Sequence, residues 1–232
     1  MFNHVIWDWN GTLLDDVEAC VQAINILLGR RGMPRVDRAR YTAVFGFPVQ
    51  EYYRQLGFDF GREDWNRVAA EYHDVYDMVA VNAPLRAGAR ATLEQCRGAG
   101  LALSVLSACE QVRLEQMMRE RGVHACFERI CGRADVYAHS KLELGRELLS
   151  AGRWRAHESV LVGDTTHDCE VAQALGIACL LMTGGHQSEA RLRPCGCPLV
   201  ADMDGVRRAL AAWGEPVEQN SGRSHAAEGR HS

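Results

Sequence analysis

Apolar runs that end in a polar side chain recur along the chain and predict buried strands. The run His4 to Trp7 is followed at once by Asp8, the run from Leu103 by Ser107, and the run from Val160 by Asp164. Short, nearly continuous apolar runs bounded by turn residues are typical of strands buried on both faces. Because ligands bind at the carboxyl ends of the strands in open parallel sheets, we expect these polar side chains to line one edge.

Residues 15–84 have a helical pattern instead. Apolar positions three and four apart predict a helix that Asp16 caps and that runs to about Arg31, followed by helices over 37–45, 49–56 and 62–80. No strand pattern interrupts them. We therefore expect a helical unit inserted after the first strand, with hinges near Asp15 and Pro84.

From residue 87 onwards, helices and strands alternate. The pattern predicts helices over 87–97, 110–121, 141–151, 168–175 and 203–213, and strands over 101–106, 127–131, 159–163, 177–182 and 198–201. Such alternation predicts an α/β fold with a doubly wound parallel sheet. Residues 214–232 are rich in Gly, Ser, His and Arg, which predicts a disordered tail.

Composition narrows the function classes. The net charge of -4 gives no electrostatic basis for nucleic-acid binding, and no apolar run or signal pattern predicts a membrane partner, so we expect a cytoplasmic protein. The nine cysteines are scattered, which favours reduced thiols over a disulfide framework. Cys195-Gly196-Cys197 is the one close pair, and without a second pair at zinc-like spacing it does not predict a metal site.

Lysine usage singles out one position. Of 26 basic Lys and Arg residues, Lys141 is the only lysine. Arginine therefore serves nearly everywhere that a solvated cation suffices, and chance survival of one lysine is the alternative. A compact ammonium is required where a cation must reach a phosphoryl oxygen or a pair of carboxylates.

Taken in order, the segment Asp8-Trp9-Asn10-Gly11-Thr12, then Ser107, Lys141, and the segment from Asp164 to Asp168 resemble the four motifs of the haloacid dehalogenase superfamily. The resemblance covers about residues 4–213 and is strongest to the phosphoglycolate phosphatase-like branch. It implies a Rossmann-like core domain (1–14 and 85–213) and a helical cap domain (15–84). It also implies a Mg²⁺-dependent phosphatase that forms an aspartyl-phosphate on Asp8.

The resemblance also implies roles for individual residues. Several carboxylates in one crevice need a compensating cation, and Mg²⁺ prefers hard oxygen ligands. The implied metal ligands are Asp8, Asp164 and the backbone carbonyl of Asn10, with Asp168 acting through water or holding Lys141. Catalytic roles fall to Asp8, Asn10, Ser107 and Lys141, and substrate-binding roles to Gly11, Thr12, Ser107, Ala108 and Lys141.

The expected substrate is a small phosphorylated metabolite. The branch suggests phosphoglycolate, while sugar phosphates and nucleotides fit as well. Within the cap, the loop Phe45 to Pro48 and Arg54 are candidates to contact the substrate, although an ordinary helix–helix turn is the simpler explanation of the loop. The sequence does not specify an oligomeric state.

Asn10 departs from the phosphatase pattern, which has a second Asp there. An amide orients water but does not exchange a proton near neutral pH, and loss of general acid–base help typically costs ~10²–10⁴-fold in rate. Three explanations stay open. Catalysis is slow or restricted to good leaving groups, or His167 or His186 supplies the proton. The third is that deamidation of Asn10-Gly11 restores an Asp in some molecules, or that Asn10 was deliberately introduced in place of an Asp.

Other activities are weighed on the same residues. A phosphonatase also lacks the second Asp, but it uses a cap lysine, and residues 15–84 contain none. A dehalogenase needs no metal and has little use for both Asp164 and Asp168. A phosphate-binding or regulatory protein with little turnover is the alternative from another class, and Asn10 is its sole support.

Overall fold

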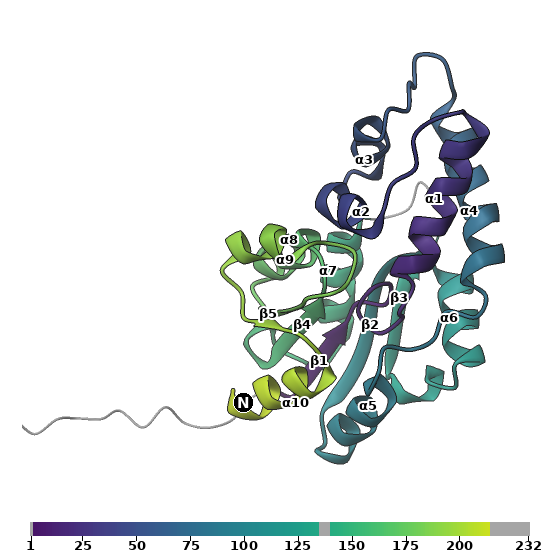
Figure 1. The fold of residues 1–232 in the computed structure, drawn as a ribbon. Coiled ribbons are helices and arrows are strands. Elements are labelled where there is room, and N and C mark those ends of the chain that lie inside the picture. Colours follow the sequence, from purple (N-terminus) through teal and green to yellow (C-terminus); the bar gives the residue numbers. More distant parts are fainter. Residues whose placement is uncertain (1, 135–139, 214–232) are drawn as a thin grey trace, which may run out of the picture.

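Six parallel strands form one sheet in the computed structural model, which describes residues 2–134 and 140–213 (Figure 1). The spatial order is β3-β2-β1-β4-β5-β6. The first strand pairs with β2 on one side and β4 on the other, so the carboxyl ends of these three strands are neighbours. The strands are β1 (His4–Trp7), β2 (Ala102–Glu110), β3 (Arg129–Arg133), β4 (Ser159–Gly163), β5 (Ala178–Met182) and β6 (Leu199–Val200).

Helices cover both faces of this sheet. Alternate residues of β1 point to opposite faces of the sheet: Val5 and Trp7 pack in one hydrophobic cluster, and Ile6 packs in another. The first cluster includes residues of α5 (Ala89–Gly98), α6 (Gln111–Glu120) and α10 (Met203–Ala212). The second includes residues of α7 (Lys141–Ala151), α8 (Thr166–Leu175) and α9 (Glu189–Leu192). The predicted doubly wound α/β sheet is confirmed.

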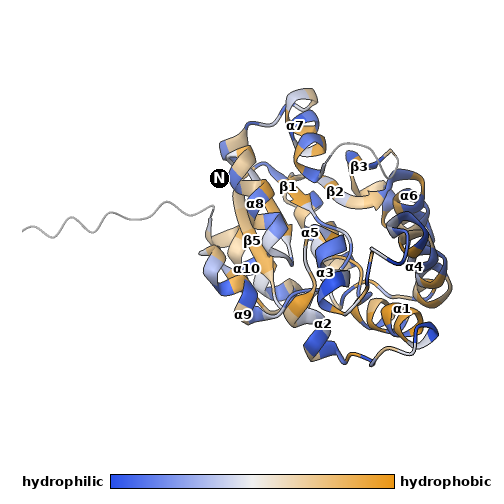
Figure 2. Ribbon diagram, turned by 90° about the horizontal axis from the view of Figure 1, so that it is seen from above, coloured by the Kyte–Doolittle hydropathy of each residue, from blue (hydrophilic) through white to orange (hydrophobic). Residues whose placement is uncertain are grey.

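Four helices follow β1 and build a hydrophobic cluster of their own. They are α1 (Val17–Arg30), α2 (Arg38–Val44), α3 (Val49–Gln55) and α4 (Trp65–Ala80). The long pair α1 and α4 lie side by side in both views (Figures 1 and 2). The apolar stripe of α1, which includes Ile24, Leu27 and Leu28, is fully buried in this cluster. The predicted helical insertion is therefore present beside the sheet.

Short 3₁₀ turns complete the fold at His124–Cys126, Ala156–Glu158 and Arg193–Cys195. No helix among the described residues has both the length and the apolar character needed to cross a membrane. The predicted disordered tail, 214–232, lies outside the described residues.

Three local predictions were wrong in detail. The strand predicted over 101–106 continues to Glu110 with a shift in its pairing to β3 after Leu106, so Ser107 lies in its irregular end. The helix predicted from Asp168 begins at Thr166, because the Thr165 side chain and Asp168 form a capping box. The short helix α9 was not predicted.

Asp16 also behaves differently from the expected helix cap. It occupies the N-cap position of α1, but its side chain makes no capping hydrogen bond. The carboxylate points instead to the loop that follows β1, where it accepts from the backbone N–H of Gly11 at 2.9 Å. The helix starts without that side-chain cap, and the carboxylate is available for other contacts.

Candidate active site

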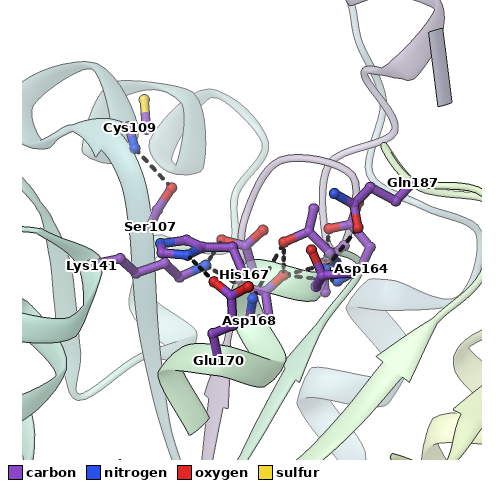
Figure 3. A network of polar contacts seen from close by, with 12 residues as sticks. Ser107, Cys109, Lys141, Asp164, His167, Asp168, Glu170 and Gln187 are labelled. Carbon is purple, nitrogen blue, oxygen red and sulfur yellow. Dashed lines mark hydrogen bonds and ion pairs between the residues drawn. The ribbon is translucent and has the colours of Figure 1, made fainter. Parts of the chain in front are cut away.

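A buried lysine joins two carboxylates at the carboxyl ends of β1 and β4. Lys141 Nζ donates to Asp8 Oδ1 at 2.6 Å and to Asp168 Oδ1 at 2.5 Å. Asp8 directly follows β1, Lys141 is the first residue of α7, and Asp168 lies in the first turn of α8. Figure 3 shows the Lys141 side chain directed towards Asp168. Three segments that are distant in sequence thus meet in one ion-paired cluster.

Both carboxylate oxygens of Asp168 accept hydrogen bonds. Its second oxygen, Oδ2, accepts from the backbone N–H groups of Asp164 at 3.2 Å and Thr165 at 2.9 Å, and from the Thr165 hydroxyl at 2.6 Å. With Oδ1 taken by Lys141, both oxygens are engaged. The side chain therefore holds Lys141 and the turn between β4 and α8 in place.

Asp164 is fixed from two sides. Oδ1 accepts from the Thr12 hydroxyl at 2.7 Å, and Oδ2 accepts from the backbone N–H of His186 at 2.6 Å. The backbone approaches so closely that a Cβ added at Gly185 would lie 2.2 Å from Asp164 Oδ2, and one at Gly11 2.3 Å from the same atom. Glycine at both positions lets the two loops close around the carboxylate.

The cluster carries more negative than positive charge. Asp8, Asp164 and Asp168 are buried, and each offers a carboxylate oxygen within 4.8 Å of the others. Burial raises the pKa of Asp8 and of Asp164 above the usual carboxyl range. Burial opposes ionisation of Asp168 as well, but Lys141 outweighs it and lowers the pKa of that carboxyl. One ammonium among three acids leaves the cluster short of a cation.

The Asn10 side chain turns towards the helical unit. Its Nδ2 donates to Asp16 Oδ2 at 2.8 Å and to the Tyr76 hydroxyl, from α4, at 3.0 Å. The Tyr76 hydroxyl donates to Asp16 Oδ2 at 2.7 Å. Asn10, Asp16 and Tyr76 therefore form a closed polar network between the loop after β1 and the inserted helices.

His186 completes this network with a buried ion pair. Its Nε2 lies 3.2 Å from Asp16 Oδ1, and its Nδ1 is 2.9 Å from the Tyr41 hydroxyl. Burial favours the neutral imidazole, but the Asp16 carboxylate outweighs it and raises the pKa of His186 to about 9. Burial likewise opposes ionisation of Asp16, and His186 outweighs it and lowers the pKa of Asp16 to about 2. The pair is charged at neutral pH.

The other proposed proton donor, His167, lies apart from this network. Its Nδ1 lies 3.2 Å from Glu170 Oε2 on the surface of α8 (Figure 3). Its ring packs against Phe47. Ser107 is buried near the end of β2, where its Oγ accepts from the backbone N–H of Cys109 at 3.1 Å. Of the two histidines, His186 is the one that pairs with Asp16 and lies next to Gly11.

A cleft of about 710 Å³ lies between α4 and α6. Its lining includes Tyr76 and Asp77 from α4, Ala108 beside Ser107, and Arg113 from α6. Arg113 pairs with Asp77 across the cleft and lies over the Tyr76 ring, 5.8 Å from its centroid. Tyr76 also contacts Asn10, so the cleft reaches the network of Asn10, Asp16 and Tyr76, while Asp8, Asp164 and Asp168 do not line it.

The loop from Phe45 to Pro48 contacts the sheet domain near the site. The Phe45 carbonyl accepts from Gln187 Nε2 at 3.0 Å and from Arg191. Arg54, the other candidate from the cap, instead pairs with Glu51 in an exposed position. The loop thus ties the helical unit to the segment that carries His186.

The sequence prediction did not include two of these groups. Tyr76 looked like part of the apolar stripe of α4, and nothing in its spacing separates it from core tyrosines. Arg86 donates to the Gly11 carbonyl at 2.9 Å and to the Thr183 carbonyl at 3.0 Å, which joins the two loops around Asp164. Its position just after the predicted hinge at Pro84 was the available signal.

Comparison with known proteins agrees with this architecture. The model of the haloacid dehalogenase-like hydrolase family matches residues 5–182. The probable phosphatase IndB of Dickeya dadantii is 28% identical over 204 residues, which are 85% of this chain and 88% of that protein. A phosphoglycolate phosphatase of Yersinia pestis is 25% identical over 189 residues, covering 78% and 81% of the two chains.

A solved structure has the same fold. The haloacid dehalogenase-like hydrolase SP0104 of Streptococcus pneumoniae superposes with a TM-score of 0.78 at 19% identity, over 91% of this chain and 98% of that one. The resemblance seen in the sequence is confirmed by the family match, which spans the strands that carry Asp8, Ser107 and Asp164. This chain belongs to the haloacid dehalogenase-like hydrolases.

Proposed function

We propose that this protein is a Mg²⁺-dependent phosphatase that hydrolyses a small phosphorylated metabolite through an aspartyl-phosphate on Asp8. One observation carries the proposal: Asp8 lies at the carboxyl end of the central strand β1, ion-paired to Lys141 and beside Asp164 and Asp168. A carboxylate nucleophile next to a cation and other acids is the arrangement that phosphoryl transfer requires. The phosphatases among the relatives support the same activity.

The donor set fits a hard divalent cation. Mg²⁺ prefers carboxylate and carbonyl oxygens and keeps several waters. Asp8 and Asp164 would hold it with side-chain oxygens and Asn10 with its backbone carbonyl, while Asp168 holds Lys141. Asp8 and Asp164 are buried and share the single ammonium of Lys141 with Asp168, so a divalent cation would balance the remaining negative charge. When bound, the ion would neutralise charge on the phosphoryl oxygens.

In the proposed reaction an oxygen of Asp8 attacks phosphorus and the phosphorus–oxygen bond to the leaving group breaks. The Lys141 ammonium and the Ser107 hydroxyl would stabilise negative charge on the transferring group. Water then attacks the aspartyl-phosphate, which releases phosphate and regenerates Asp8. Lys141 is already held between Asp8 and Asp168, so it needs no large movement to serve both steps.

The proton for the leaving group is the open step. The Asn10 amide orients water but exchanges no proton near neutral pH. His186 pairs with Asp16, which also contacts Asn10, and lies close to Gly11; we propose it as the proton donor in preference to His167. Without such a donor, turnover would be limited to substrates with good leaving groups.

The substrate body would occupy the cleft between α4 and α6. Tyr76, Asp77 and Arg113 give this cleft both hydrogen-bonding and charged groups, which suit a small polar metabolite. Gly11, Thr12 and Ala108 remain proposed substrate contacts, although the Thr12 hydroxyl and the Gly11 N–H group are engaged by Asp164 and Asp16 here. We also propose that the protein works in the cytoplasm, where its nine free cysteines stay reduced.

A second candidate function rests on Asn10 alone. A low-activity or non-catalytic protein of the same fold would bind phosphate and have no need of an acid–base residue. The Asn10 Nδ2 donates to both Asp16 and Tyr76, which a purely structural role explains. The ion pair of Lys141 with two acids speaks for turnover, since binding alone needs no nucleophile.

The two functions are separated by hydrolysis of p-nitrophenyl phosphate, measured with and without Mg²⁺. The activated leaving group needs little protonation, so the assay isolates the attack by Asp8. We expect Mg²⁺-dependent turnover that Asp8→Asn abolishes and that Asp15→Asn, the same change at an exposed neighbour, leaves intact. A folded protein that hydrolyses nothing at any Mg²⁺ concentration would support the binding function instead.

A further inference from the structure

Three thiols from separate elements meet on the face of the sheet that α8 covers. Cys169 lies in α8, Cys179 in β5, and Cys197 in the loop before β6. Their sulfur atoms all lie within 4.8 Å of one another, and those of Cys169 and Cys197 are 3.1 Å apart. The sequence shows only the Cys195-Gly196-Cys197 pair. Cys169 and Cys179 lie far from that pair in sequence, and the packing of α8 against β5 brings them next to Cys197.

The surroundings of this cluster are apolar. Cys169 and Cys179 are 2% and 8% exposed, and both belong to the hydrophobic cluster beneath α8. Gln173 Nε2 lies 3.3 Å from Cys169 Sγ, and the Cys195 thiol also hydrogen-bonds to Cys169. The sulfurs therefore face mainly one another.

The spacing suits metal coordination better than a disulfide. Bonded sulfurs are about 2.05 Å apart, so the 3.1 Å between Cys169 and Cys197 is not a bond. Zinc–thiolate bonds are about 2.3 Å, which places tetrahedral sulfurs roughly 3.8 Å apart. Separations of 3.1 Å to at most 4.8 Å bracket that value.

The loop supplies a further donor next to the sulfurs. The Cys195 carbonyl oxygen lies 3.8 Å from both Cys169 Sγ and Cys197 Sγ. Gly196 between the two cysteines has a φ of +69°, a conformation that glycine adopts without strain. This turn directs the carbonyl and the Cys197 thiol to the same side, so a fourth ligand position lies within reach.

We propose that Cys169, Cys179 and Cys197 bind one Zn²⁺ ion, or another thiophilic divalent ion, at a site distinct from the carboxylate cluster. Binding converts three thiols and the ion into a tris-thiolate complex and releases three protons to solvent. The Cys195 carbonyl or a water completes the coordination. Because Cys169 follows Asp168 in the first turn of α8, the ion would fasten that turn to β5 and to the loop before β6.

The test uses the full chain, reduced with a phosphine, stripped with a chelator and titrated with Cd²⁺. Thiolate-to-cadmium charge-transfer absorption in the ultraviolet reports sulfur ligands and ignores carboxylate sites. We expect absorption that saturates at one Cd²⁺ per chain and is displaced by Zn²⁺. Cys179→Ser and, separately, Cys197→Ser should lose it, whereas Cys96→Ser, at a buried cysteine on the other face of the sheet, should keep it.

Two outcomes would overturn the site. One is the absence of charge-transfer absorption at stoichiometric Cd²⁺, or its survival in both cluster variants. The other combines two results: mass spectrometry of the thiol-blocked native protein finds a Cys169–Cys197 disulfide, and the reduced protein binds no Cd²⁺. Together they would assign this cysteine pair to redox chemistry. Cys197 lies in a loop, so its variant tests the site even where Cys179→Ser does not fold. Phosphatase activity is a separate readout, and its absence would not affect this result.

Discussion

Asn10 Nδ2 lies 2.8 Å from Asp16 Oδ2, so the amide that replaces the expected acid donates to a carboxylate a few residues along the chain. The sequence suggests that Asn10→Asp would simply restore a general acid. The contact shows that the new carboxylate would face Asp16, and two acids this close share a proton, which raises one of their pKa values. The substitution therefore creates a partly buried acid pair in which one carboxyl has a raised pKa.

We predict that Asn10→Asp raises kcat by about 10²-fold on alkyl phosphates, whose leaving groups need a proton, and much less on p-nitrophenyl phosphate. Steady-state kinetics on the two substrates measure this difference. The matched control is Asn10→Asp combined with Asp16→Asn, which keeps a single carboxylate in the pair; because it also removes the partner of His186, its stability is measured alongside its activity. Equal effects on both substrates, or none, would show that protonation of the leaving group does not limit the rate.

Lys141 provides the second prediction. Its ammonium is 5% exposed and fits between Asp8 and Asp168 at 2.6 Å and 2.5 Å. A guanidinium keeps the charge but is larger and planar, so Lys141→Arg should displace Asp8 from its position. We expect kcat on p-nitrophenyl phosphate to fall by about 10²-fold or more, the scale typical of removing one stabilising donor.

The control for this substitution is Arg31→Lys in the cap, where the guanidinium pairs with Glu63 and Glu71 far from Asp8. This control replaces an arginine by a lysine, the reverse of Lys141→Arg, and also lies in a cluster of ion pairs. Stability measured by urea unfolding is expected to fall in both variants, but kcat only in Lys141→Arg. Full activity of Lys141→Arg would mean that a cation of any shape suffices between the two acids.

A third prediction concerns the loop packed on Asp164. A Cβ at Gly185 would lie 2.2 Å from Asp164 Oδ2, so Gly185→Ala must push the carboxylate or the loop aside. Displacement of a positioned group by about 1 Å can cost roughly 10²-fold in rate. We expect kcat/KM to fall by that order and the Mg²⁺ concentration for half-maximal activity to rise.

Gly29→Ala is the matched substitution for this test. Gly29 lies in α1 with no atom within 4 Å of its added Cβ, so the change should leave activity unaltered and stabilise the helix by about 0.5–1 kcal/mol. Activity titrated against Mg²⁺ separates the two variants. If Gly185→Ala retained the wild-type Mg²⁺ dependence, Asp164 would tolerate movement and its proposed role as a ligand would lose support.

The sequence predicted the groups that lie at strand ends and missed those that arrive by tertiary contact. Asp8 and Asp164 end apolar runs, and the parallel topology then brings them together. Lys141 was found through composition, because a single lysine among many arginines indicates a specific demand. The helical pattern from residue 17 suggested a capping role for Asp16, and no local signal shows that its carboxylate faces His186 from the loop after β5.

The same limit applies to the thiol cluster and to the cap. The Cys195-Gly196-Cys197 pair lacked a partner pair in the sequence because Cys169 and Cys179 sit at unrelated spacings on a helix and a strand. Tyr76 has the spacing of a core residue in α4, yet its hydroxyl contacts Asn10 and Asp16. Periodicity reports which side of a helix is buried, but it does not report what that side touches.

The last prediction concerns stability and lies away from the catalytic site. His4, on the central strand β1, is fully buried and stacks on Trp154 at 3.9 Å, while Ser104 and Ser159 lie 2.8 Å and 3.1 Å from its two ring nitrogens. Burial lowers the pKa of His4 from 6.5 to about 4. The unfolded chain therefore takes up a proton below about pH 6.5, whereas the folded protein does so only near pH 4.

Stability should consequently decrease as the pH falls through that interval, by about 2 kcal/mol between pH 7 and pH 5 from this one residue. Urea unfolding at the two pH values measures the loss. His4→Gln is expected to be less stable at pH 7, because it loses the stacking, but to lack this part of the pH dependence. His157→Gln, at an exposed histidine, should keep the wild-type dependence. An identical pH dependence in His4→Gln and the wild type would mean that His4 titrates alike in the folded and unfolded chains, and that burial does not hold it neutral.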